Sequence, residues 1–292
     1  MSSNISKPDK KLTFDFFDYK WKRVPQWAKA TENIYRQWYL DRYGYKTVDG
    51  LQEFLKDKKR ILEAGCGLAR DSKLFAECNS SAQIVAMDQS PSALKVARET
   101  LGQFENCWIV RADITNLSGY GVFDFISCDQ VMHHTPEPEH TMSNFYKHLV
   151  PGGVLNFSIC RKKNEYRDLV DDLIMERART MSPEELWKFA ETVTLLGKSL
   201  HELNIKDVDW NKKKYPDIQN FIHNQVFRCW YNPDIDFELS VSSNYDWFCG
   251  NPRFTFPEVV EMMRKGLGPH KILRVHLDDA VISFSVQKTA GL

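Results

Sequence analysis

The sequence lacks three features that would each narrow the class of protein. Its seven cysteines form no C-x-x-C pair and make an odd number, so we expect reduced thiols rather than disulfides. No stretch approaches the roughly 18 apolar residues of a membrane span, and the polar first residues have no apolar core of signal-peptide length. The 39 basic and 39 acidic side chains cancel, whereas nucleic-acid binding usually requires a basic face. We therefore expect a cytoplasmic protein that does not bind membranes, and the balanced charge weakens the case for nucleic acid as a partner.

The most informative segment is residues 60–70, where an apolar run ends at Glu63 and two glycines follow one residue apart. This pattern is typical of a buried strand that turns tightly into a helix. Gly65 and Gly67 permit a positive φ and let the backbone approach a ligand closely. The dinucleotide fingerprint G-x-G-x-x-G needs a small residue where this chain has Arg70, and Glu63 would repel a phosphate. The turn therefore favours a cationic ligand without phosphate.

Acidic residues also end the next two predicted strands. The apolar run 83–88 ends at Asp88, about 20 residues after the first turn, where a carboxylate can accept both hydroxyls of a ribose. The run 108–114 ends at Asp113 and Ile114. Asp113 can accept a hydrogen bond from an exocyclic amine, and Ile114 can pack on the face of a purine. Because the carboxyl ends of parallel strands meet at one edge of a sheet, we expect all three carboxylates there.

These segments resemble the class I S-adenosylmethionine-dependent methyltransferases, specifically the small-molecule branch that includes the quinone-biosynthesis enzymes. Five pieces match in the family's order, at residues 61–69, 85–90, 111–114, 123–135 and 149–155. The resemblance implies S-adenosyl-L-methionine as cofactor and S-adenosyl-L-homocysteine as product. Where the family often has a third glycine, this chain has Ala69. The cofactor-binding residues that the resemblance implies are Glu63, Gly65, Cys66, Gly67, Asp88, Gln89, Asp113, Ile114, Asp129 and Gln130.

Alternating strands and helices from residue 60 predict an α/β fold with a doubly wound sheet. Two apolar runs at 271–277 and 280–288 predict an antiparallel hairpin. With the resemblance, these observations predict a Rossmann-like, mostly parallel seven-stranded sheet that ends in this C-terminal hairpin. We expect four segments, which are an aromatic-rich helical cap (1–50), the cofactor-binding core (51–161), an inserted acceptor-binding lid (162–250), and a C-terminal helix and hairpin (251–292).

The expected insertion changes character along its length. Residues 164–180 and 183–203 are typical of helices, the second one capped at Ser182, and the rest is dense in aromatic residues. Such a composition suits a lid that lines an apolar pocket, an ordinary small core, or the interface of a homodimer. The substrate-binding candidates are His133, His223, Arg228 and Tyr245, and His223, Arg228 or the lysines at 212–214 can anchor a carboxylate.

The catalytic candidates follow the predicted fourth strand, 123–128. Positioning of the acceptor supplies most of the acceleration of methyl transfer, and a base is needed only if the acceptor must lose a proton. His133, His134 and Asp129 are the candidates, and His133 is preferred over His134 for contact with the acceptor. We expect no metal site, because adjacent histidine side chains should diverge and no other residues complete a ligand set.

The leading interpretation is a biosynthetic methyltransferase that acts on an O, N or S atom of a small polar or aromatic metabolite. Two alternatives stay open. A tRNA or protein methyltransferase would show a basic stripe across the mouth of the site. A non-catalytic partner would bind S-adenosylmethionine without turnover.

Overall fold

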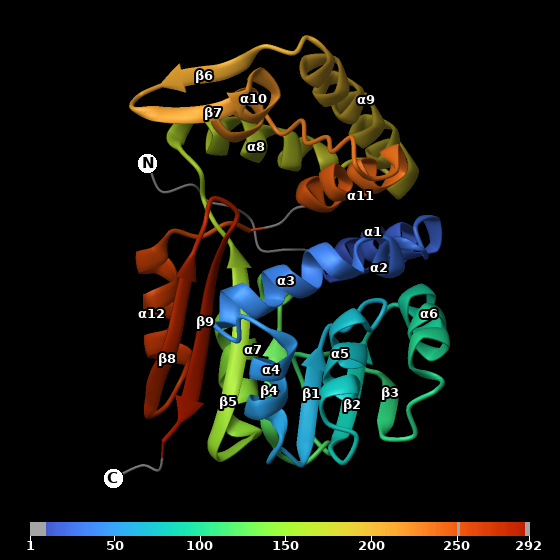
Figure 1. Ribbon diagram of the computed structural model, residues 1–292, viewed down its shortest axis with the longest axis vertical. Coiled ribbons are helices and arrows are strands. Elements are labelled where there is room, and N and C mark those ends of the chain that lie inside the picture. The colour runs from blue at the N-terminus through green and yellow to red at the C-terminus, as the bar shows by residue number, and fades with distance from the viewer. Residues whose placement is uncertain (1–9, 250–251, 290–292) are drawn as a thin grey trace. The chain divides into compact units, whose positions relative to one another are not determined.

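The computed structural model describes residues 10–249 and 252–289, which form two compact units (Figure 1). The larger unit comprises Pro25–Arg161 and Arg253–Leu292, and the smaller unit comprises Met1–Val24 and Lys162–Pro252. The aromatic-rich N-terminal segment is thus divided between the two units. In the part of the chain described, no helix has both the length and the apolar character that crossing a bilayer requires.

The larger unit is built on a seven-stranded sheet with the order β3-β2-β1-β4-β5-β9-β8 (Figure 1). The first five strands in this order are parallel, and β9 is antiparallel to both β5 and β8. This arrangement confirms the predicted fold class. The strands are β1 (Arg60–Ala64), β2 (Gln83–Asp88), β3 (Cys107–Arg111), β4 (Phe123–Cys128), β5 (Leu149–Cys160), β8 (His270–Leu277) and β9 (Val281–Lys288).

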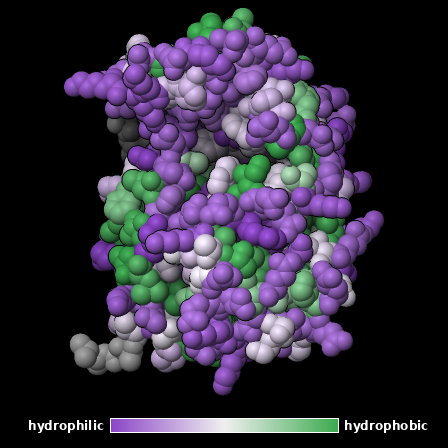
Figure 2. All heavy atoms as spheres, in the orientation of Figure 1, coloured by the Kyte–Doolittle hydropathy of each residue, from purple (hydrophilic) through white to green (hydrophobic). Residues whose placement is uncertain are grey.

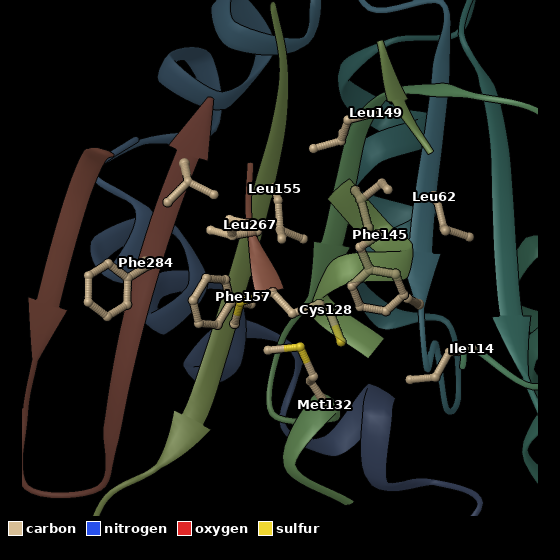
Figure 3. Packing of buried hydrophobic residues seen from close by; sticks show 14 of the residues in the cluster. Leu62, Ile114, Cys128, Met132, Phe145, Leu149, Leu155, Phe157, Leu267 and Phe284 are labelled. Carbon is tan, nitrogen blue, oxygen red and sulfur yellow. The ribbon is translucent and has the colours of Figure 1, made fainter. Parts of the chain in front are cut away.

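The central strands β1, β2, β4 and β5 are buried on both faces, which explains why they are almost continuously apolar. Successive side chains alternate between two cores, so that Ile61 and Phe125 face one core while Leu62 and Ile126 face the other. Figure 3 shows part of the second core, in which Phe145 lies near the sheet. The first core includes residues of α3 (Glu32–Tyr43), α4 (Val48–Leu55) and α5 (Arg70–Cys78), and the second includes residues of α7 (Pro138–Lys147) and α12 (Phe256–Gly266).

Two strand boundaries differ from the prediction, each for a local reason. β3 ends at Arg111 because Asp113 begins a turn, in which its carboxylate and its carbonyl accept from the two amides that follow Ile114. β5 begins at Leu149, whereas the apolar run 154–160 after the proline and glycines predicts a strand that begins at Val154. The pairing register of β5 with β4 shifts between Phe123 and Phe125. The proline and glycines of 151–153 form an irregular part of β5 at this shift.

The smaller unit is mainly helical. The predicted helix at 183–203 is confirmed, and Ser182 and Glu185 form the reciprocal capping box at its start. A two-stranded hairpin was not predicted, because its turn at Asn211 and Lys212 has positive φ angles without any glycine. The elements are α1 (Lys10–Arg23), α8 (Glu165–Ala178), α9 (Pro183–Glu202), β6 (Lys206–Trp210), β7 (Lys213–Asp217), α10 (Ile218–Gln225) and α11 (Phe237–Phe248).

The edge strand β8 exposes several apolar side chains. Ile272, Val275 and Leu277 are each between 43% and 48% exposed, and Figure 2 shows a hydrophobic area over the edge of the sheet where β8 lies. Lys271 and Arg274 are interspersed along the same strand, as is common at sheet edges that avoid pairing. A homodimer stays a prediction.

Candidate active site

The turn after β1 carries the two glycines of the motif in left-handed conformations, with φ of 81° at Gly65 and 50° at Gly67. The amides of Gly65 and Cys66 both donate to the Met87 carbonyl of β2, at 2.8 and 2.9 Å. A Cβ at Gly65 would lie 2.3 Å from Cγ1 of Val131, in the turn after β4. Only glycine fits here, because backbone conformation and space both exclude a side chain.

Glu63, at the end of β1, faces the start of helix α5. Its carboxylate accepts from the Ser72 amide at 2.7 Å and from the Ser72 hydroxyl. Burial, together with the charge of Asp71, raises the pKa of Glu63 well above its usual range. Glu63 therefore fixes the helix against the glycine turn, and its predicted contact with the cofactor stays a prediction. Burial likewise raises the pKa of the Cys66 thiol, which keeps it protonated.

Asp88 joins the glycine turn to the next helix. Its Oδ2 accepts from the Gly67 amide at 2.8 Å, and its Oδ1 accepts from the Ser90 amide at 2.8 Å. Ser90 in turn caps helix α6 (Pro91–Leu101) by accepting from the Ala93 amide. The carboxylate is therefore held at the carboxyl end of β2, beside the turn, as the sequence predicts.

Asp113 lies just beyond the end of the neighbouring strand β3. Its carboxylate accepts from the Thr115 amide at 2.9 Å, and the side-chain amide of Gln89 approaches the same oxygen at 3.4 Å. Ile114 is buried, and its carbonyl accepts from Asn144. The structure thus brings Gln89 and Asp113 together at this edge, although their contact with an adenine stays a prediction.

Asp129 follows β4 and has three side-chain partners. It accepts from Arg42 at 3.1 Å, from the Tyr43 hydroxyl at 2.8 Å and from the Ser158 hydroxyl at 2.7 Å. Burial opposes its ionisation, but the Arg42 charge and these hydrogen bonds lower the pKa of Asp129 below its usual range. It is therefore a carboxylate that holds α3 against the end of β4. Sequence reasoning missed its three partners, because no spacing links residues that are 29 to 87 positions away.

The turn then passes through Gln130, with a φ of 57°, into a short 3₁₀ helix at Met132–His134. His133 is fully buried and His134 is half-buried. The expectation that these two side chains diverge is wrong, since their ring centroids lie 4.2 Å apart. The two rings are tilted by 36° to one another. Even so, no group of three or more potential metal ligands is present among residues 10–249 and 252–289.

Aromatic rings from the N-terminal helices surround the start of α5. The Arg70 guanidinium lies 4.9 Å from the ring centroid of Tyr35 and 5.9 Å from that of Trp27, and it pairs with Asp71 at 2.7 Å. Ala69 has a φ of 61°, the conformation that the family's usual glycine would adopt without strain. This part of the aromatic-rich segment therefore packs beside the glycine turn within the larger unit.

The other three acceptor-binding candidates belong to the smaller unit. The Tyr245 hydroxyl donates to the Phe16 carbonyl at 3.1 Å, and its ring is buried in an aromatic cluster. Arg228 donates to Asn244 at 3.0 Å and to the Ser243 hydroxyl at 2.8 Å. His223 is buried. Contact of these residues with an acceptor stays a prediction.

The strand order, the glycine turn after β1 and the carboxylates that follow β2 and β3 define the class I S-adenosylmethionine-dependent methyltransferase fold and its cofactor site. The left-handed glycine cradle and these carboxylates fit a cationic nucleoside, so S-adenosylmethionine is the cofactor of this class of site. The family model described as "Methyltransferase domain" matches residues 55–220. The chain belongs to this methyltransferase family.

Characterised relatives are similar over parts of the chain. Trans-aconitate 2-methyltransferase of Azoarcus sp. is 31% identical over 111 residues, which are 38% of this chain and 43% of that protein. The ubiquinone biosynthesis O-methyltransferase of Aromatoleum aromaticum is 27% identical over 164 residues, 50% of this chain and 69% of that protein. The chain spans between 25% and 66% of the lengths of three curated relatives, which include this trans-aconitate 2-methyltransferase and a malonyl-[acyl-carrier protein] O-methyltransferase of Ilyobacter polytropus.

Among solved structures, an N-methyltransferase from Bradyrhizobium japonicum in complex with S-adenosyl-L-homocysteine aligns with a TM-score of 0.43 and 12% identity. The alignment covers 86% of this chain and 91% of that one.

Proposed function

We propose that this protein transfers a methyl group from S-adenosylmethionine to an O, N or S atom of a small polar or aromatic metabolite. The observation that carries the proposal is the bridge that Asp88 makes between the Gly67 amide and the Ser90 amide. It fixes a carboxylate beside a backbone cradle that admits no Cβ, which suits a ribose next to a methionine moiety. When bound, the cofactor supplies an activated methyl on a sulfonium that leaves as a neutral thioether.

In this proposal, the residues of the larger unit have separate roles. Gly65 and Gly67 allow the backbone to approach the methionine moiety, Asp88 accepts from the ribose, and Asp113 with Gln89 meets the base. Glu63 and Asp129 act as positioning residues, since each holds a helix against the sheet edge. Placing an acceptor in line with the methyl contributes about 7 to 11 kcal/mol to such reactions, so precise placement is the main demand on the protein.

His133 and His134 are the candidates for a base or for contact with the acceptor. A histidine with a pKa near neutral can take a proton from a hydroxyl or an ammonium group. If one of them is the base, its change to asparagine should lower kcat more than KM and flatten the acidic limb of the pH profile. A contact role would instead raise KM and leave the pH profile unchanged.

A small acceptor is supported by the balanced charge of the chain and by the names of two relatives, for trans-aconitate and for ubiquinone biosynthesis. A cytoplasmic setting belongs to the same proposal, since none of the seven cysteines forms a disulfide.

Two measurements test the proposal. Calorimetry should detect binding of S-adenosylmethionine and S-adenosylhomocysteine, and Asp88→Ala should weaken both at least tenfold, while the exposed Glu261→Ala leaves both unchanged. Incubation with methyl-labelled cofactor and a fractionated metabolite extract should then label a small molecule. Label in tRNA or protein would favour a macromolecular acceptor, and cofactor binding without any labelled product would favour a non-catalytic partner.

A further inference from the structure

Three cationic side chains of the smaller unit gather around one indole ring. Lys163 Nζ lies 6.0 Å from the ring centroid of Trp247, and the guanidinium carbons of Arg167 and Arg228 lie 5.5 and 5.0 Å from it. They come from three separate places in the sequence, which are the residues before α8, the first turn of α8, and the segment after α10. The fold therefore brings three cationic side chains from distant parts of the sequence to one point within this unit.

Arg167 is the fully buried member of this cluster, with 0% of its surface exposed. Its Nε donates to both carboxylate oxygens of Asp171, each at 3.0 Å, and Asp171 also accepts from the indole nitrogen of Trp247 at 2.9 Å. Its two terminal nitrogens have no hydrogen-bond partner among the residues that the structure describes. A buried charged group that lacks partners for its donors costs free energy, so an occupant that accepts from both nitrogens is favoured.

His223, on α10, adds a second buried polar group. It is 7% exposed, and its Nδ1 likewise has no hydrogen-bond partner within the described ranges. Burial, and then the charges of Arg228, Arg167 and Lys163, hold the pKa of His223 well below its usual range. The histidine is therefore neutral at pH 7.

Arg228 is held rigidly in this cluster. Its Nε donates to the Asn244 side chain, and one terminal nitrogen donates to both the carbonyl and the hydroxyl of Ser243. Asn244 is itself buried and donates to the Thr194 hydroxyl at 2.8 Å. This network fixes the orientation of the Arg228 guanidinium.

We propose that Arg167, Arg228 and His223, with Trp247 as their platform, form an oxyanion-binding site for a carboxylate or phosphate group of the methyl acceptor. This inference rests on the proposed function and adds a substrate class to it. The two terminal nitrogens of Arg167 have the spacing of a bidentate pair with either group. The sequence singled out Arg228 and His223 but gave no signal for Arg167, whose pattern is that of an ordinary charged helix residue.

The test begins with the unmodified full-length chain. Sodium phosphate and sodium malonate are titrated in separate arms against sodium chloride of equal ionic strength, and the unfolding temperature is followed by scanning fluorimetry. We expect saturable stabilisation with a midpoint in the millimolar range by at least one of the two. Stabilisation by phosphate alone assigns a phosphate group, and stabilisation by malonate alone assigns a carboxylate. If neither raises the unfolding temperature above the chloride control, the proposal is overturned.

Variants locate the effect. Arg167→Met and Arg167→Lys should each weaken the ion's apparent affinity at least tenfold, because the lysine retains the charge but loses the two-pronged donor. Arg264→Met, which removes an exposed arginine charge from α12, should leave the affinity unchanged. If Arg167→Met does not fold, Arg167→Lys decides. Full ion binding in a folded Arg167→Lys variant would overturn the assignment of Arg167.

Cofactor binding separates this inference from the proposed function. Arg167→Lys should bind S-adenosylhomocysteine like the unmodified chain and raise KM for an anionic acceptor with little change in kcat. A chain that binds the oxyanion but not S-adenosylhomocysteine would contradict the proposed function alone. If the unmodified chain and the Arg167→Lys variant methylate the acceptor with equal KM, the oxyanion site alone is contradicted.

Discussion

Replacement of Gly65 should destabilise the fold for two separate reasons, which are its backbone conformation and the lack of space for a side chain. A Gly65→Ala change places a Cβ 2.3 Å from Cγ1 and 2.7 Å from Cγ2 of Val131, on a residue whose φ is 81°. The left-handed backbone alone costs about 1–2 kcal/mol for a residue with a Cβ. Alanine recovers about 0.4–1 kcal/mol through the unfolded chain, and overpacking adds about 1–3 kcal/mol. We expect a net destabilisation of about 1–5 kcal/mol.

Gly119 provides a matched control for the backbone contribution. Its φ is 87°, and an added Cβ would meet no atom within 4 Å. Gly119→Ala should therefore cost only about 1 kcal/mol or less. The double change Gly65→Ala with Val131→Ala removes both clashing methyl groups and leaves a contact of 3.0 Å with Cβ of residue 131. This pair should recover at least about 1 kcal/mol relative to the sum of the single changes.

Urea unfolding at pH 7, followed by fluorescence, measures these differences, and thermal unfolding should shift by about 2–4 °C per kcal/mol. Calorimetry with S-adenosylhomocysteine on the variants that remain folded reports the effect on the cradle. If Gly65→Ala costs no more than Gly119→Ala, or if Val131→Ala gives no recovery, the close packing of the two turns is not what requires glycine.

Three further predictions concern the same unit. Asp129→Asn should destabilise the fold by about 3–5 kcal/mol near neutral pH, because Arg42 stays buried without its carboxylate. The folded-state pKa of Asp129 is lowered, so its contribution to the free energy of unfolding is present above the unfolded pKa of about 4 and is lost as the pH falls through the folded value. The urea unfolding curves of the two proteins should therefore converge in acid. A difference in unfolding free energy that stays constant down to about pH 3 would contradict this. Ala69→Gly should change stability by less than about 1 kcal/mol, because relief of the positive φ offsets the added chain entropy, whereas Ala69→Val should destabilise measurably in the same urea assay. Cys66 should react with a thiol reagent only on unfolding, because burial raises its pKa well above the usual range. Cys66→Ser should therefore leave unchanged the number of thiols that react rapidly in the folded protein.

The sequence by itself determined the sheet and the carboxyl ends of β1 and β2. Apolar runs that end in an acid at Glu63 and Asp88, with glycines after the first, are local patterns, and each follows from steric and burial requirements over a few residues. The C-terminal hairpin was equally readable, since two apolar runs flank a short polar turn. Positions within the cofactor site could therefore be predicted from short segments of chain.

The tertiary structure decided which partners these residues meet. Asp129 and Arg42 are 87 positions apart, and nothing in the chain between them fixes that their charges pair. Arg167 and Trp247 come together in the smaller unit in the same way, through packing of helices α8 and α11. A hydrogen bond or ion pair across such separations depends on the packed geometry of whole elements, whereas sequence periodicity reports only the local face on which a side chain lies.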